Sequence, residues 1–250
     1  MKPLSIVLIG AGNVASHLGP ALAAAGHNLV CVYSHTLANA QALASNVNAT
    51  GVDQLDLLPS SADLYLVSVK DDALPEVAAQ LNLGSRLVAH TSGTKPLSVL
   101  QGASSNVGVF SPLQTFSKGK SVHIRQVPML IEGPDTLVAL AQQLSDNVQR
   151  IDSAQRKRLH VAAVFACNFT NHLYAIAETL LAESNLSLDL LKPLIHETAA
   201  KIDAGSPADM QTGPAIRKDD AVLAEHLELL KDHKDFQELY YLLSNSIQRH

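Results

Sequence analysis

A glycine-containing turn between a buried strand and a helix constrains this chain more than any other feature. Leu4 to Ile9 is an almost wholly apolar run, typical of a strand that helices cover on both faces of a parallel sheet. Gly10-Ala11-Gly12-Asn13-Val14-Ala15 follows, and a helical pattern then continues to a stop at Gly26. This order predicts a strand–turn–helix unit at the start of an α/β fold.

The residues of this turn are of the types that a dinucleotide requires. The first glycine permits the tight turn, the second lets a pyrophosphate approach the backbone, and the small Ala15 allows close helix–strand packing. Free N–H groups at the helix N-terminus also attract phosphate. We therefore expect Gly10, Ala11, Gly12, Asn13 and Val14 to bind a dinucleotide. The alternative is a tight turn without a ligand.

The end of the second strand bears on which dinucleotide binds. NAD enzymes usually carry an acidic residue there, roughly 20 residues after the glycines, but no Asp or Glu precedes Asp53 in this chain. Ser34, His35 and Thr36 stand there instead, and they favour NADP over NAD because they can donate hydrogen bonds to a 2′-phosphate. Against this, no Lys or Arg lies between positions 2 and 70, and His35 fits equally well as a solvated loop residue.

Strand and helix patterns alternate up to Ile151 and only helical patterns follow. Besides the first pair, we expect strands at 29–33, 64–69, 86–90, 107–110, 128–131 and 148–151 and helices at 37–45, 73–81 and 135–145. The later helices are expected at 154–183, 188–202, 219–230 and 235–247. The pattern predicts an α/β, doubly wound Rossmann-like domain over residues 1–152 and an all-helical domain over 153–250.

Polar residues follow two of the predicted strands. Ligands bind outside the carboxyl ends of parallel strands, so we expect Val69 and Lys70 to contact the cofactor and His90 and Ser92 to contact a substrate. For Lys70 and the two aspartates after it, a solvated turn with a helix N-cap explains the residues equally well.

A polar stripe interrupts the long apolar helix of the second domain. His160, Asn168, Asn171 and His172 fall near one helix face by i+3 and i+4 steps, and such groups are costly to bury without partners. We interpret the stripe as a substrate-facing wall. The alternative is a polar seam that bonds other helices or a dimer mate.

The loop at 204–218 joins two predicted helices and contains a Gly-Pro turn. We expect it to present Thr212 and Arg217 to a substrate, with Arg217 binding a carboxylate in bidentate fashion. A surface salt bridge from Arg217 to Asp219 or Asp220 is equally compatible with the sequence.

The composition excludes several functional classes. The net charge of −5 and the pI near 6.1 show no basic excess for nucleic acid or a membrane surface. Two cysteines are too few for a secreted disulfide framework, so we expect a reducing, cytoplasmic location. Polar residues and glycines interrupt the apolar stretch from Leu4 to Gly26. We therefore interpret it as a buried strand followed by a helix rather than as a leader peptide or a membrane anchor. The chain lacks HExxH or Cys/His ligand spacing and a Gly-x-Ser-x-Gly elbow, so neither a metal site nor a serine hydrolase is expected.

Four further segments carry a resemblance to a known family. They are His90-Thr91-Ser92-Gly93, Phe110-Ser111-Pro112-Leu113-Gln114-Thr115-Phe116, Ala166-Cys167-Asn168-Phe169-Thr170-Asn171-His172 and Gln211-Thr212-Gly213-Pro214-Ala215-Ile216-Arg217. With the glycine turn, the chain resembles predicted oxidoreductases that join a Rossmann-like domain to a helical domain of unknown function. That family is related to pyrroline-carboxylate reductase, ketopantoate reductase and the phosphogluconate dehydrogenase superfamily.

The resemblance implies NADP-type binding and a homodimer built through the helical domains, but it supplies no established substrate. Several relatives use a lysine early in the helical domain, and His160 occupies a similar place here. We therefore expect an NADP-dependent oxidoreductase that reduces a C=O or C=N bond of a small, carboxylate-bearing metabolite, of ketopantoate or imino-acid type. His160 would donate or orient a proton, and Asn168 and Asn171 would position the substrate. The alternative is a nucleotide-binding redox sensor or regulatory protein without turnover.

Overall fold

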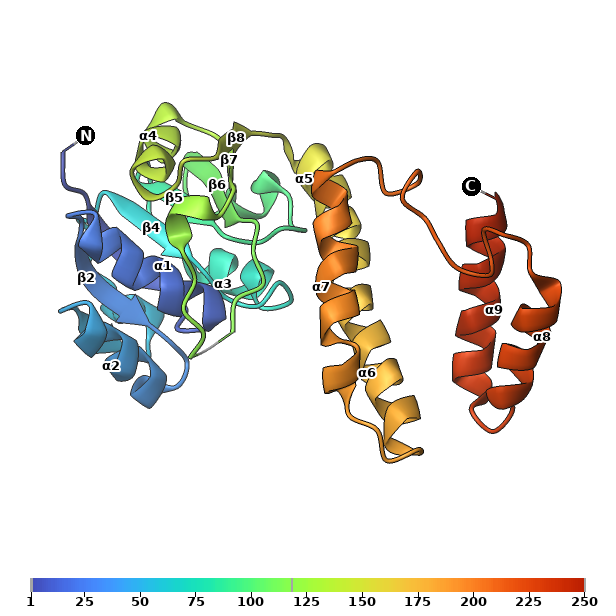
Figure 1. Cartoon of the computed structure of the whole chain (residues 1–250). Helices are drawn as coiled ribbons and strands as arrows, with labels where there is room; N and C mark the ends of the chain where they lie inside the picture. The colour runs from blue at the N-terminus through green and yellow to red at the C-terminus, as the bar shows by residue number, and fades with distance from the viewer. Residues whose placement is uncertain (1, 118, 250) are drawn as a thin grey trace. The chain divides into compact units, whose positions relative to one another are not determined.

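The chain divides into two compact units, Met1–Val164 and Phe165–His250. The computed structural model describes residues 2–117 and 119–249 (Figure 1). The units divide twelve residues after the boundary expected at 152, because helix α5 (Ser153–Ala163) belongs to the first unit. The first unit is the α/β part and the second is helical, as the sequence predicts.

The first unit is built on one eight-stranded sheet in the order β3-β2-β1-β4-β5-β6-β7-β8. Its strands are β1 (Ser5–Ile9), β2 (Asn28–Tyr33), β3 (Thr50–Val52), β4 (Leu64–Val67), β5 (Leu87–His90), β6 (Asn106–Pro112), β7 (Met129–Glu132) and β8 (Val148–Arg150). The order from β3 to β6, all parallel, is that of dinucleotide-binding folds. The predicted doubly wound fold is therefore confirmed.

Helices cover both faces of this sheet. They are α1 (Asn13–Ala24), α2 (Leu37–Asn46), α3 (Leu74–Gln80) and α4 (Asp135–Leu144) (Figure 1). Alternate residues of β1 point to opposite faces: Leu8 joins the core beneath α1, α2 and α4, whereas Val7 joins the core beneath α3. Burial on both faces explains why the first strand reads as a continuous apolar run.

Two features of the sheet are absent from the sequence-based prediction. Strand β3 has only three residues and pairs with β2 at the edge of the sheet. It is too short to show an alternating pattern. Strand β7 runs antiparallel to β6, and hydrophobic periodicity carries no information about strand direction.

The helical unit begins inside a long helix. Residues Val164–Phe169 form a π-helical segment between α5 and α6 (Thr170–Ala182), and the Thr170 hydroxyl donates to the carbonyl of Phe165, five residues back, at 3.2 Å. A π segment closes i→i+5 bonds, so the i+3 and i+4 steps that placed the polar stripe on one face do not hold through it. The placement of the stripe residues on one face therefore stays a prediction.

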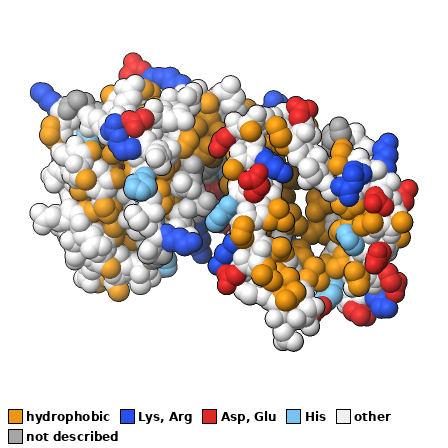
Figure 2. Space-filling view, in the orientation of Figure 1, with side chains coloured by type: hydrophobic (Ala, Val, Ile, Leu, Met, Phe, Trp, Pro, Cys, Tyr) orange, Lys and Arg blue, Asp and Glu red, His pale blue; other side chains and the backbone are white. Residues whose placement is uncertain are grey.

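The helices of this unit leave their side chains exposed or only partly buried. Helices α7 (Lys192–Ala200), α8 (Asp220–Leu229) and α9 (Lys234–Arg249) follow α6, and none of the four has a buried residue among those described. Hydrophobic side chains lie on the surface of this unit (Figure 2), among them Leu190, Leu194, Ile202, Leu229, Tyr241 and Leu242. Within the described part of the chain, no helix is long and apolar enough to cross a membrane.

Candidate functional site

The glycine turn lies where the strand order reverses, between β1 and β4. Gly10 has φ of 119°, and a Cβ there would collide with the carbonyl of Ser68, just after β4. At Gly12, the N-cap of α1, a Cβ would meet nothing within 4 Å. Position 10 therefore requires glycine for the fold itself. Position 12 has open space in front of it, which a pyrophosphate needs in order to approach.

Three residues predicted to favour NADP lie between β2 and the start of α2. Ser34 is buried, and its hydroxyl accepts the backbone N–H of Thr36 at 3.3 Å. His35 and Thr36 are exposed. Thr36 is the N-cap of α2 but its side chain makes no capping bond, and the first turn of α2 contains no acidic residue. The helix therefore presents an uncapped, positively polarised end to solvent. Of the two residues predicted after β4, Val69 is half-buried and Lys70 is exposed.

The long loop after β6 is hydrogen-bonded to the start of α1. The Asn13 amide donates to the carbonyl of Phe116 at 3.1 Å, and His17 Nε2 lies 2.9 Å from the carbonyl of Lys120. The rings of His17 and Phe116 are 4.9 Å apart. The side chain of Asn13, predicted to bind the cofactor, is thus engaged within the protein. His17 was not predicted from the sequence, because no local pattern links it to a loop so distant in the chain.

His90 is a fully buried, neutral imidazole at the end of β5. Its Nδ1 atom accepts the backbone N–H of Ser92 at 3.2 Å, so the proton of the neutral ring lies on Nε2. Burial, and after it the positive charge of Arg156, lowers the pKa of His90 to about 4.

The hydroxyl of Ser92 organises the turn that follows. It accepts the backbone N–H groups of Thr94 and Lys95 at 3.1 and 3.0 Å. The hydroxyl of Thr94 in turn donates to the carboxylate of Asp71, which follows β4. These bonds join the segments after β4 and β5 into one edge of the site. Ser92 therefore fixes the loop, and contact with a substrate stays a prediction.

His160 lies against this loop. It is an exposed residue of α5, and a Cβ on Gly93 would lie 2.9 Å from its Nδ1 atom. Gly93 thus lets the imidazole approach the backbone one residue after Ser92. The structure brings together His90, Ser92 and His160, three residues that the sequence analysis proposed separately.

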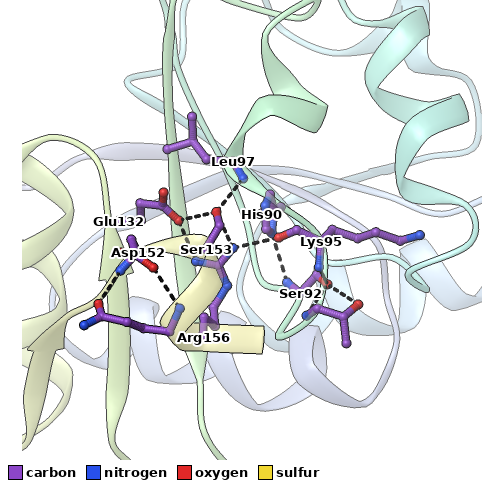
Figure 3. A network of polar contacts seen from close by, with 10 residues as sticks. His90, Ser92, Lys95, Leu97, Glu132, Asp152, Ser153 and Arg156 are labelled. Carbon is purple, nitrogen blue, oxygen red and sulfur yellow. Dashed lines mark hydrogen bonds and ion pairs between the residues drawn. The ribbon is translucent and has the colours of Figure 1, made fainter. Parts of the chain in front are cut away.

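A buried arginine joins α5 to the sheet beneath this loop (Figure 3). Arg156 is 1% exposed, and its guanidinium contacts Glu132 Oε2 and the Lys95 carbonyl, each at 2.7 Å. Ser153 donates to the same Glu132 oxygen at 2.7 Å and accepts the backbone N–H of Leu97 at 3.0 Å. Arg156 was not predicted from the sequence, because its partners lie on other elements.

The other predicted site residues belong to the second unit. Asn168, Asn171, His172, Thr212 and Arg217 are all exposed, so the cost of burying the polar stripe does not arise in the single chain. Among the described residues, Arg217 makes no ion pair, which leaves the proposed salt bridge to Asp219 or Asp220 without support. Their contacts with a substrate stay predictions.

Comparisons with known proteins cover both units. Residues 1–113 match a Rossmann-like domain and residues 127–247 match the Domain of unknown function (DUF2520). No curated protein sequence matches the chain.

Solved structures match along the whole chain. A protein of Bacteroides fragilis, provisionally named an NADP oxidoreductase, is 44% identical with a TM-score of 0.92, covering 99% of both chains. A Thermotoga maritima protein is 21% identical with a TM-score of 0.75, covering 98% of this chain and 97% of that one. A reductive aminase of Aspergillus terreus, solved with NADPH, is 14% identical with a TM-score of 0.71, covering 99% and 93%. The last two show likeness of fold alone. The chain belongs to the family that joins a Rossmann-like domain to the DUF2520 domain.

Proposed function

We propose that this protein is an NADP-dependent oxidoreductase that reduces a C=O or C=N bond of a small, carboxylate-bearing metabolite. The observation that carries the proposal is the position of His160 against Gly93, in the loop that follows the buried His90 and in the same compact unit as the open glycine turn. A titratable side chain therefore stands at the carboxyl edge of the sheet, where ligands of such folds bind. The name of the Bacteroides fragilis relative supports the same activity.

The choice of NADP rests on the start of α2. A 2′-phosphate requires hydrogen-bond donors, and the uncapped helix end with His35 and Thr36 offers them, with no acidic residue in the first turn of α2. Two more distant relatives, the Aspergillus terreus aminase and a Myxococcus stipitatus imine reductase, were solved with NADPH and NADP⁺. NAD is the less favoured cofactor.

The proposed reaction needs a proton as well as a hydride. The cofactor would supply a hydride to the carbon of the C=O or C=N bond, and the oxygen or nitrogen would take a proton. His160 is our candidate to donate or orient that proton, because an imidazole can serve as a general acid and this one is exposed beside the loop. Asn168 and Asn171 are proposed to position the substrate, with His172, Thr212 and Arg217 as further contacts.

We also propose that the protein is a homodimer built through the helical domain. Large apolar side chains of the second unit, among them Phe165, Leu194 and Leu229, are exposed in the described chain, and exposed apolar patches mark interaction surfaces. A second copy carries the same unpaired faces and can cover them symmetrically.

The function is tested by binding and then by turnover. Thermal shift with NADPH, NADP⁺ and NADH comes first, because a ligand of the native state raises its stability by mass action. NADPH oxidation is then followed with a panel of 2-keto acids, beginning with ketopantoate, and of cyclic imino acids. We expect selective stabilisation by NADPH and steady oxidation with a member of the panel.

The His160→Ala variant tests the proton role. It should lower turnover while leaving NADPH affinity intact, and unchanged turnover would remove His160 from the reaction. Tight NADPH binding without oxidation across the panel would instead favour a non-catalytic sensor. The matched control is His123→Ala, a histidine of the loop before β7.

A further inference from the structure

The first turn of α5 is bonded to two different parts of the first unit. Arg156 and Ser153 both contact Glu132 at the end of β7. On the other side, they contact the Lys95 carbonyl and the Leu97 N–H, which lie in the segment after β5. One short stretch of helix therefore connects β7 with the loop that carries His90 and Ser92.

The same loop meets α5 again one turn later. Gly93 lies against the imidazole of His160, four residues after Arg156 on the helix. Residues i and i+4 of a helix lie on one face, so the loop contacts Arg156 and His160 on the same face of α5. The position of His160 over Gly93 thus depends on how the first turn of α5 is fixed.

Stability alone is a poor explanation for this arginine. Removing a guanidinium from water is expensive, and buried ion pairs are often no more stabilising than apolar residues of similar volume. Among the described residues, Arg156 Nε is buried without a hydrogen-bond partner, which adds to the cost. The planar guanidinium instead fixes orientation, because its rigid fork binds a carboxylate and a carbonyl in defined directions.

We propose that Arg156 is a positioning residue that fixes α5 against the loop after β5 and thereby holds the His160 imidazole over Gly93. The part of this inference that concerns catalysis rests on the proposed function, in which His160 handles the proton. The part that concerns position does not depend on any activity.

The first test replaces Arg156 by lysine. Arg156→Lys keeps the positive charge but loses the fork, so a single ammonium cannot reproduce both contacts. In protein with isotope-labelled histidine rings, assigned with His160→Gln, we expect the nuclear Overhauser contact between His160 and the Gly93 α-protons to weaken at least twofold. With a substrate from the panel, kcat should fall tenfold or more while the Kd for NADPH changes less than twofold. An unaltered His160 contact in Arg156→Lys overturns the proposal.

Gly93→Ala provides a second route if the lysine variant does not fold. The new Cβ would stand 2.9 Å from His160 Nδ1, so the ring must move, while the backbone needs no left-handed conformation. We expect a displaced His160 signal and the same loss of kcat. Gly102→Ala is the matched control, because a Cβ there meets nothing within 4 Å. An unmoved His160 ring in Gly93→Ala would also contradict the proposal. If the wild type oxidises no NADPH, the proposed function fails, whereas the His160 contact still decides the positioning role.

Discussion

The Nδ1 atom of His90 accepts the backbone N–H of Ser92 at 3.2 Å, and both residues are buried. The bond requires a neutral imidazole, because a protonated ring has no acceptor. Burial, followed by the charge of Arg156, lowers the pKa of His90 to about 4. In the unfolded chain a histidine has a pKa near 6.5. Between about pH 4 and pH 6.5 the unfolded chain therefore binds a proton at this residue and the folded protein does not.

The fold should therefore lose stability as pH falls through this window. The contribution of His90 is fully present above about pH 6.5 and is lost progressively as pH falls toward about 4, by up to about 1.4 kcal/mol per pH unit. Urea unfolding at pH 7.5, 6 and 5 measures it. His90→Asn should be less stable at pH 7.5 and show a shallower fall than the wild type. The control, His35→Asn, changes an exposed histidine. Equal slopes for wild type and His90→Asn would contradict this account.

The two glycines of the turn should respond differently to alanine. Gly10→Ala meets the Ser68 carbonyl and needs a positive φ, so it should lower the free energy of unfolding by about 2 kcal/mol or more. Gly12→Ala meets nothing within 4 Å, and because alanine is a poorer N-cap than glycine it should lower that free energy by only about 0.5 to 1 kcal/mol. If a pyrophosphate approaches here, Gly12→Ala should still abolish the thermal shift by NADPH. A stable Gly12→Ala variant with normal NADPH binding would place the dinucleotide elsewhere.

Local features of the fold can be predicted from the sequence, whereas contacts between residues far apart in the chain cannot. The strand before Gly10 and the helix from Asp135 were predictable because their signals, an apolar run and a helical period, are local. The bond from Asn13 to Phe116 spans 103 residues, and the pair of Arg156 with Glu132 spans 24. Such contacts depend on which elements become neighbours, so only the folded chain reveals them. His160 was chosen by type and position, whereas its contact with Gly93 emerged only in three dimensions.

The choice between NADP and NAD should depend on charge at the start of α2. His35→Asp places a carboxylate where the 2′-phosphate is proposed to bind, so the affinity for NADPH should fall at least tenfold while that for NADH changes little. Gln41→Glu adds the same charge to an exposed position of α2 beyond its first turn and serves as the control. Fluorescence titration gives both Kd values. An equal effect of the two variants on NADPH would remove His35 from the phosphate site.

The apolar faces of the helical unit should determine the oligomeric state. Phe165 is 66% exposed and Leu194 is 62% exposed, so in a monomer a charge at either position would be harmless. In the proposed dimer, Phe165→Glu or Leu194→Glu would bury an unpaired carboxylate, which costs several kcal/mol. We expect sedimentation to show a dimer for the wild type and a shift toward monomer for both variants. Leu57→Glu changes a leucine of the α/β unit that is 56% exposed, and it should leave the dimer unchanged. Dissociation by Leu57→Glu alone would place the interface on the α/β unit, whereas a monomeric wild type would refute the dimer.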